Sequence, residues 1–143
     1  MSGMIGGAGS KSGIIGETEL DYETGTYTVS DLSGNVSGTA TGNYTLIGDI
    51  CTAQGYWQST STQSTNTNNP HFALPFTCSA HGLGTVMFEN VELGGMYTIA
   101  TVYPTHNYWR AFWVVQTNSW GLLQAGNISN NDIIVFNITY KIS

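Results

Sequence analysis

Charged side chains are scarce in this sequence of 143 residues, and most of those present are acidic. Only 8% of the residues are charged, with three Lys and Arg against nine Asp and Glu, so the formal net charge is −6. A nucleic-acid-binding surface needs Lys and Arg to neutralise phosphates. The composition therefore argues against nucleic acid as a partner.

Long apolar runs and targeting signals are also missing. No run approaches the roughly 20 apolar residues that a membrane-spanning helix needs. The first nine residues are small and glycine-rich, without the basic start and apolar segment of a signal peptide. We therefore expect no membrane insertion, and a chain that is made and folded in a cytoplasm.

Cysteine is nearly absent as well. The chain has only Cys51 and Cys78, which is too few for a zinc site of the usual kind. A disulfide between two strands is one interpretation, but a chain without a secretory route favours a pair of small buried thiols. No cofactor or metal is expected.

The residues that are abundant predict an all-β domain. Thr, Tyr, Trp and Val suit strands, while Gly and Asn supply turns. No helical period persists, and turn signals recur at the spacing that is typical of a sandwich or barrel. We predict a single antiparallel β-sandwich of about eight strands: Gly25–Val29, Tyr44–Ile47, Ile50–Gln58, Phe72–Phe76, Thr85–Leu93, Met96–Tyr103, Tyr108–Gln116 and Ile133–Ile142.

Alternation along these segments indicates which side chains face the core. Ile134, Phe136, Ile138, Tyr140 and Ile142 share one face of the last strand. The runs 113–115 and 133–135 are apolar on both faces, which is typical of strands that are central or are covered by a neighbouring subunit. This pattern favours oligomerisation; a crowded monomeric core is the alternative.

The segment before the first strand has a different character. Glu17, Glu19, Asp21 and Glu23 alternate with Thr and apolar residues after a flexible Gly/Ser run. In an extended chain these carboxylates lie on one edge, where they repel one another. We interpret residues 1–24 as a tether and residues 25–143 as the sandwich. The candidate anchoring residues are Ile14, Ile15, Glu17, Glu19, Leu20, Asp21 and Tyr22.

Three motifs in this chain resemble a family. "SKSGIIGETELDYETGTYT" at residues 10–28, "GNYTLIGDI" at 42–50 and "LPFTCSA" at 74–80 are similar, in this order, to a module of bacteriophage virion proteins. Such modules occur near the ends of tail fibres and as free-standing fibre or decoration proteins, especially in phages of aquatic bacteria. The chain departs from the family at Tyr27-Thr28-Val29, where an aromatic pair and a proline are usual, and at Leu46, where a basic residue is common.

The resemblance implies a jelly-roll-like sandwich that assembles as a homotrimer around a threefold axis. It also implies a virion location reached by host-cell lysis, with the tether contacting a capsid or tail component. Host adhesion is the expected function. A capsid decoration role that braces the shell is the close alternative, and a stand-alone lectin is the third.

Loops rich in Tyr, Trp, Asn, Ser and Thr are the candidate contacts with a host glycan or protein, because aromatic and amide side chains suit adaptable recognition. The alternative is that they only cap the sandwich. The residues expected to carry recognition are Gln63, Asn66, Asn68, Asn69, His106, Asn107, Tyr108 and Trp120.

Catalysis has weaker support. A glycosidase needs two carboxyl groups about 5–9.5 Å apart in a cleft, and the possible pairs are Glu17/Glu19, Glu89/Glu92 and Asp31/Asp49. Their positions in the tether and beside turns favour ordinary solvated carboxylates. His71, His81 and His106 all lie beside turns, and no nucleophile motif accompanies them. We predict a protein that is not an enzyme.

Overall fold

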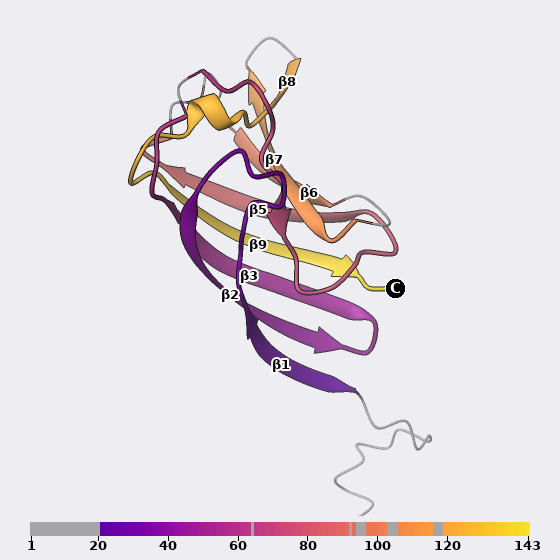
Figure 1. The fold of residues 1–143 in the computed structure, drawn as a ribbon. Coiled ribbons are helices and arrows are strands. Elements are labelled where there is room, and N and C mark those ends of the chain that lie inside the picture. Colours follow the sequence, from indigo (N-terminus) through magenta and orange to yellow (C-terminus); the bar gives the residue numbers. More distant parts are fainter. Residues whose placement is uncertain (1–20, 64, 92, 94–96, 103–105, 116–118) are drawn as a thin grey trace, which may run out of the picture.

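The computed structural model describes residues 21–63, 65–91, 93, 97–102, 106–115 and 119–143. This part of the chain is all-β, as predicted, with one 3-10 turn and no helix that is long and apolar enough to cross a membrane (Figure 1). Its elements are β1 (Tyr22–Tyr27), β2 (Gly38–Ile47), β3 (Ile50–Ser59), β4 (Phe72–Ala73), β5 (Gly82–Glu89), β6 (Tyr97–Val102), β7 (Tyr108–Val115), β8 (Ser119–Leu122), η1 (Ala125–Asn127) and β9 (Ile133–Lys141).

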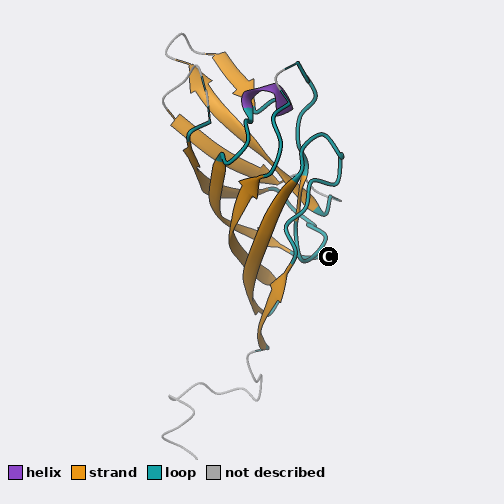
Figure 2. Ribbon diagram, turned by 60° about the vertical axis from the view of Figure 1, so that its left-hand side comes forward, coloured by secondary structure: helices purple, strands orange, loops and turns teal. Residues whose placement is uncertain are grey.

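All strand pairs are antiparallel and follow the order β1-β2-β3-β9-β5-β6-β7-β4, with β8 on β7. β5 is the junction: residues 82–85 pair with β6, whereas residues 83–89 pair with β9. The architecture is sandwich-like, with β1, β2, β3, β9 and β5 in one antiparallel sheet and β6, β7 and β8 in the other, where the two-residue β4 also pairs with β7. Loops and η1 gather along one side of the strands (Figure 2).

The core lies on the inner face of the five-stranded sheet. Alternate residues of β3 and β9 are buried there, including Cys51, Trp57, Ile134 and Ile138, which confirms the face predicted for the last strand. Loop residues complete the core and are as fully buried as the strand residues: Val29, Val36, Pro70, Leu74, Cys78, Leu123 and Ile128.

A chain of aromatic rings connects four strands across this core. Trp57 of β3 meets Phe72 of β4 edge-on at 5.3 Å between ring centroids, and Phe72 stacks on Trp109 of β7 at 4.7 Å. Trp109 then lies 4.8 Å from Phe136 of β9. Each such pair contributes about 0.5–1.5 kcal/mol beyond the burial of its area, so these contacts hold the two layers together.

Aromatic rings also lie directly over glycines on neighbouring strands. Tyr27 pairs with Gly42 and Tyr44 pairs with Gly25 between β1 and β2. A Cβ added at Gly25 would lie 2.6 Å from atoms of the Tyr44 ring, and one at Gly42 would contact the Tyr27 ring even more closely. These positions need glycine because the ring occupies the space of a side chain.

Several predicted boundaries were wrong. β1 begins at Tyr22 rather than Gly25, so residues 22–24 belong to the sheet. β2 begins at Gly38, because the full length of β3 pairs with residues 38–47; the glycines there accommodate aromatic rings and do not form turns. Residues 119–122 form β8 instead of a loop, since they pair with β7. Residues 94–95, which join two of the predicted strands and whose Gly-Gly pair predicts a hairpin turn, lie outside the described residues.

The two cysteines are free and buried, in agreement with the interpretation as thiols. Burial raises the pKa of both thiols above the ordinary value, so they resist ionisation. Cys51 and Cys78 therefore act as small core residues.

Candidate functional site

The predicted anchoring residues are only partly within the described structure. Ile14, Ile15, Glu17, Glu19 and Leu20 lie outside the described residues, and Asp21 immediately precedes β1. Tyr22 begins β1, with its side chain 65% exposed, opposite Ile47 of β2. Ile47 in turn pairs with Ile50 of β3, and both isoleucines are 43% exposed. Tyr22, Ile47 and Ile50 thus form an apolar corner beside the point where the N-terminal segment enters the sheet.

The four amide residues of the predicted recognition loop are largely engaged in internal contacts. Asn66 and Asn68 donate from their side chains to Asn35, and Asn69 donates to the carbonyl of Leu123 at 3.0 Å. Backbone bonds join the same loop to η1, including Gly126 N–H to the carbonyl of Asn66 at 2.7 Å. The backbone N–H of Gln63 reaches the carbonyl of Ile128. These bonds favour the capping alternative for this loop.

Asp31 organises the turn that underlies this cap. Its carboxylate accepts from the backbone N–H groups of Ser33, Asn35, Val36 and His71, at 3.0, 2.7, 3.0 and 2.7 Å respectively. It also accepts from the Ser33 hydroxyl. Five hydrogen bonds give this carboxylate a structural role, so it is not available for a glycosidase pair.

The predicted residues 106–108 form an aromatic cluster where β7 begins. Tyr108 stacks on His71 at 4.1 Å between ring centroids, and His106 meets Tyr108 edge-on at 4.7 Å. Arg110 lies 5.7 Å from the centre of the same ring. Burial and the neighbouring Arg110 lower the pKa of His71, against the opposing effect of Asp31. Asn107 is exposed beside this cluster, and Trp120 is 65% exposed on β8.

The remaining catalytic candidates do not converge within the described residues. Asp49 forms an ion pair with Lys141 at 2.8 Å, which lowers the pKa of the carboxyl. Glu89 ends β5, and His81 lies just before that strand. In the described part of the chain, His, Cys, Asp and Glu do not form a group of three that could hold a metal ion.

The largest uncovered feature is the outer face of the five-stranded sheet. Its outward side chains are exposed or half-buried along all five strands. Among the described residues, most of the exposed large apolar side chains lie on this face, with exposures from 42% to 67%: Tyr22, Ile47, Ile50, Tyr56, Leu83 and Met87. Polar outward positions are mostly Thr, Asn and Gln. No described element packs against this surface, which we call the open face.

A groove of about 650 Å³ crosses the middle of the open face. Strand register places two rows of side chains along it. One row is polar and runs Asn43, Gln54, Asn137, Thr85 over β2, β3, β9 and β5. The next row is more apolar and runs Thr41, Tyr56, Val135, Met87. None of the residues that line the groove carries a charge.

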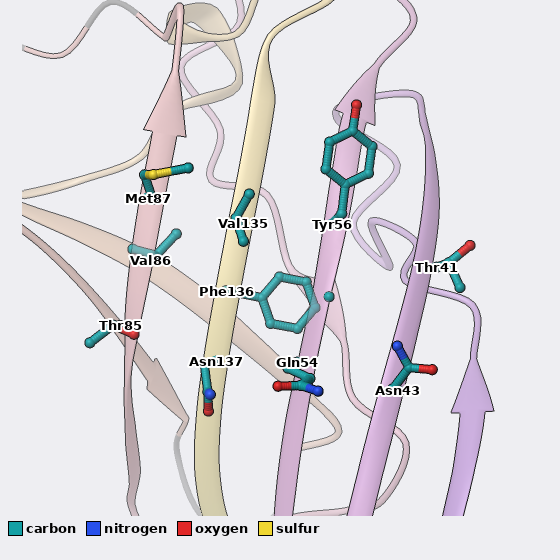
Figure 3. Close-up of a pocket in the computed structure, with 11 residues that line it drawn as sticks. Thr41, Asn43, Gln54, Tyr56, Thr85, Val86, Met87, Val135, Phe136 and Asn137 are labelled. Carbon is teal, nitrogen blue, oxygen red and sulfur yellow. The ribbon is translucent and has the colours of Figure 1, made fainter.

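The side-chain amides of the polar row lie next to one another (Figure 3). Within the described residues, the side chains of Asn43, Gln54 and Asn137 make no hydrogen bond. Nearby groups differ: Thr52 and Thr139 bond to each other at 3.1 Å, and the Tyr56 hydroxyl donates to Gln58 at 3.0 Å. The three amides are therefore available to a ligand, whereas the amides of the cap are engaged in internal bonds. The groove therefore offers amide, hydroxyl and apolar side chains to a ligand, without a charged one among its lining residues.

Comparison with known proteins gives no relative for this chain: no family model, no curated protein and no solved structure matches it.

The sequence pattern predicted recognition by loops and did not predict the groove. One feature of the sequence does indicate an unusual strand surface. The outward positions of β2, β3, β5 and β9 carry Thr, Asn, Gln, Tyr and Met where exposed strands commonly carry Lys or Glu. Recognising the polar row additionally requires the register of four strands that are far apart in the sequence.

Proposed function

We propose that this protein is a non-enzymatic structural protein of a bacteriophage particle, displayed on the particle surface as a host-adhesion module of the tail-fibre type. The sequence resemblance supports the virion assignment. The observation that carries the adhesion function is the open face, which combines exposed apolar side chains, unpartnered amides and a groove without charge. Exposed apolar surface of this kind marks an interaction site.

The proposal includes the finer features that the resemblance implies. These are the jelly-roll-like connectivity, assembly as a homotrimer, and attachment to a capsid or tail component through the N-terminal tether. The chain is made in the host cytoplasm and leaves by lysis. Several copies on one particle convert weak single-site contacts into firm attachment.

A capsid decoration role is the second candidate, and a specific observation favours it. The apolar corner of Tyr22, Ile47 and Ile50 lies where the N-terminal segment enters β1. An apolar contact beside the tether would help a cement protein to brace neighbouring shell subunits. In that case the corner and tether, and not the groove, would carry the function. A stand-alone lectin, the third candidate, would use the groove and have no partner on a particle.

Electron microscopy of intact particles from the source lysate tests the proposal. Density for this sandwich at the tail periphery, with the open face directed outward, is the expected result. Density on the shell with residues 1–20 laid across capsid subunits would replace adhesion with decoration. Absence of the chain from purified particles, checked by mass spectrometry, would refute the virion assignment.

A further inference from the structure

We propose that the groove of the open face binds a neutral glycan chain, with the row of Asn43, Gln54 and Asn137 bonding to sugar hydroxyls. The inference rests on the proposed adhesion function and specifies its ligand and its site. It places recognition on the strands, away from the loops at which the sequence pointed.

The first argument is hydrogen-bonding capacity. Each amide offers two N–H donors and a carbonyl acceptor on one side chain, which matches hydroxyl groups that both donate and accept. Asn43, Gln54 and Asn137 occupy successive strands in direct register. Strands lie about 4.8 Å apart, so the row presents such a group at intervals close to the length of one sugar ring. A single extended glycan can therefore contact all three.

The second argument is the adjacent apolar row. Tyr56, Val135 and Met87 lie on β3, β9 and β5, each two residues along its strand from Gln54, Asn137 and Thr85 of the polar row. A sugar ring has hydroxyls at its edge and C–H groups on its face, so it needs polar and apolar partners side by side. Tyr56 is 42% exposed and supplies a broad ring. Its hydroxyl donates a hydrogen bond to the side chain of Gln58. Such a rigid, amphipathic ring is suited to recognition.

The third argument is charge. The chain has a net charge of −6, yet the groove is lined by uncharged residues only. An acidic polysaccharide would meet no cation in the groove and would be repelled by the rest of the molecule. A basic peptide would find no carboxylate to pair with there. A neutral glycan, which is uncharged and rich in hydroxyl groups, therefore matches this surface better than either of them.

Side-chain amide signals in ¹H–¹⁵N NMR spectra of the full-length protein test this directly. The probes are the hexasaccharides of cellulose, laminarin, starch and mannan, with oligogalacturonate as the acidic probe. We expect at least one neutral probe to shift the NH₂ signals of Asn43, Gln54 and Asn137. Gln54→Ala, which removes one amide, should weaken the affinity for that probe roughly 3- to 10-fold. Gln54→Ala/Asn137→Ala, which removes two, should weaken it roughly 10- to 100-fold.

Asn130→Ala is the matched control, because Asn130 is an exposed amide between η1 and β9 and does not line the groove. It should bind like the wild type. The inference is overturned if no neutral probe shifts the three signals at about 10 mM, if oligogalacturonate binds more tightly, or if Asn130→Ala abolishes binding. Shifts that depend on protein concentration without sugar would assign the open face to a second copy instead.

Adhesion and glycan binding can fail separately. Binding to host cells can be compared for the fluorescently labelled wild type and for Gln54→Ala/Asn137→Ala. Equal binding by the two proteins would support the proposed adhesion function and refute the groove as its site. Protein that is absent from particles but binds a neutral probe through the groove would refute the virion assignment and retain the glycan site.

Discussion

Two tyrosines in the same core have opposite hydrogen-bonding states. The hydroxyl of Tyr27 is buried without a partner among the described residues. The hydroxyl of Tyr140 accepts from the backbone N–H of Phe76 at 3.3 Å. Burial raises the pKa of both well above the ordinary range. An unpartnered buried hydroxyl costs about 1–3 kcal/mol, so the core tolerates a local penalty at Tyr27.

Replacing Tyr27 with Phe should therefore stabilise the protein by about 1 kcal/mol at pH 7. Both tyrosines have a raised pKa in the folded state. Above about pH 10 they therefore ionise in the unfolded chain but not in the folded protein, so the free energy of unfolding falls as the pH rises; below about pH 10 it is unaffected by these groups. Tyr27→Phe should make that alkaline loss shallower. Urea unfolding from pH 7 to 11 measures both effects. Tyr140→Phe, which removes a hydrogen bond, is the control and should destabilise at pH 7; equal destabilisation by both variants would contradict the argument.

Asp31 illustrates how one carboxylate can organise a cap. Its four backbone donors come from the turn at residues 33–36 and from His71, which precedes β4. Asp31→Ala should cost about 3 kcal/mol, because it leaves several N–H groups without their acceptor. Asp31→Asn should cost less, since the amide keeps one accepting oxygen. Thermal unfolding measures the order, and Asp49→Ala, which removes an exposed carboxylate, should change the melting temperature little. An unchanged melting temperature in Asp31→Ala would refute this role.

At the scale of the strands, cross-strand glycine–aromatic pairs set the geometry of the β1–β2 edge. Tyr27 faces Gly42 and Tyr44 faces Gly25, so each strand provides one ring and one gap. The gap is needed for space, because the nearest atoms to an added Cβ at Gly42 all belong to the Tyr27 ring. A glycine in a strand otherwise weakens it, so its benefit here depends on the ring.

Gly42→Ala should therefore destabilise the protein by about 2 kcal/mol, through displacement of the Tyr27 ring. In a Tyr27→Ser background the same substitution should be neutral or stabilising, because alanine suits a strand better than glycine once the space is empty. Chemical denaturation of the four proteins in the double-mutant cycle measures the coupling. Additive effects would show that the ring is not what requires glycine.

The sequence predicts elements with strong alternation and misses features that depend on distant partners. β3 and β9 were located correctly, because Cys51, Ala53 and Trp57, like Ile134, Phe136, Ile138 and Tyr140, recur at every second position in segments without a helical period. The cap could not be predicted, because the acceptors for the loop amides, such as Asn35 and the carbonyl of Leu123, are far away in the sequence. The groove was missed for the same reason, since its two rows exist only once four strands are in register.

At the scale of the molecule, the open face divides into two regions. The groove lies over the middle of the sheet, and the apolar corner of Tyr22, Ile47 and Ile50 lies at the β2–β3 turn. The corner is apolar but has no amide row, which suits contact between protein surfaces rather than a glycan. The corner lies beside the N-terminal segment, so the proposed assembly and attachment contacts would both leave the groove accessible.

This division predicts the effect of charge at the corner. Ile47→Asp/Ile50→Asp should convert the proposed homotrimer to a monomer at micromolar concentration, because an interface would have to bury two carboxylates without partners. The circular dichroism spectrum should not change, since both side chains are substantially exposed. Sedimentation equilibrium measures the mass. Thr67→Asp/Asn130→Asp adds the same charge in the cap, at two exposed positions, and should stay trimeric. The corner would be contradicted as the site of assembly if the wild-type chain sediments as a monomer or if the corner variant remains trimeric. Glycan binding by the corner variant still tests the groove independently.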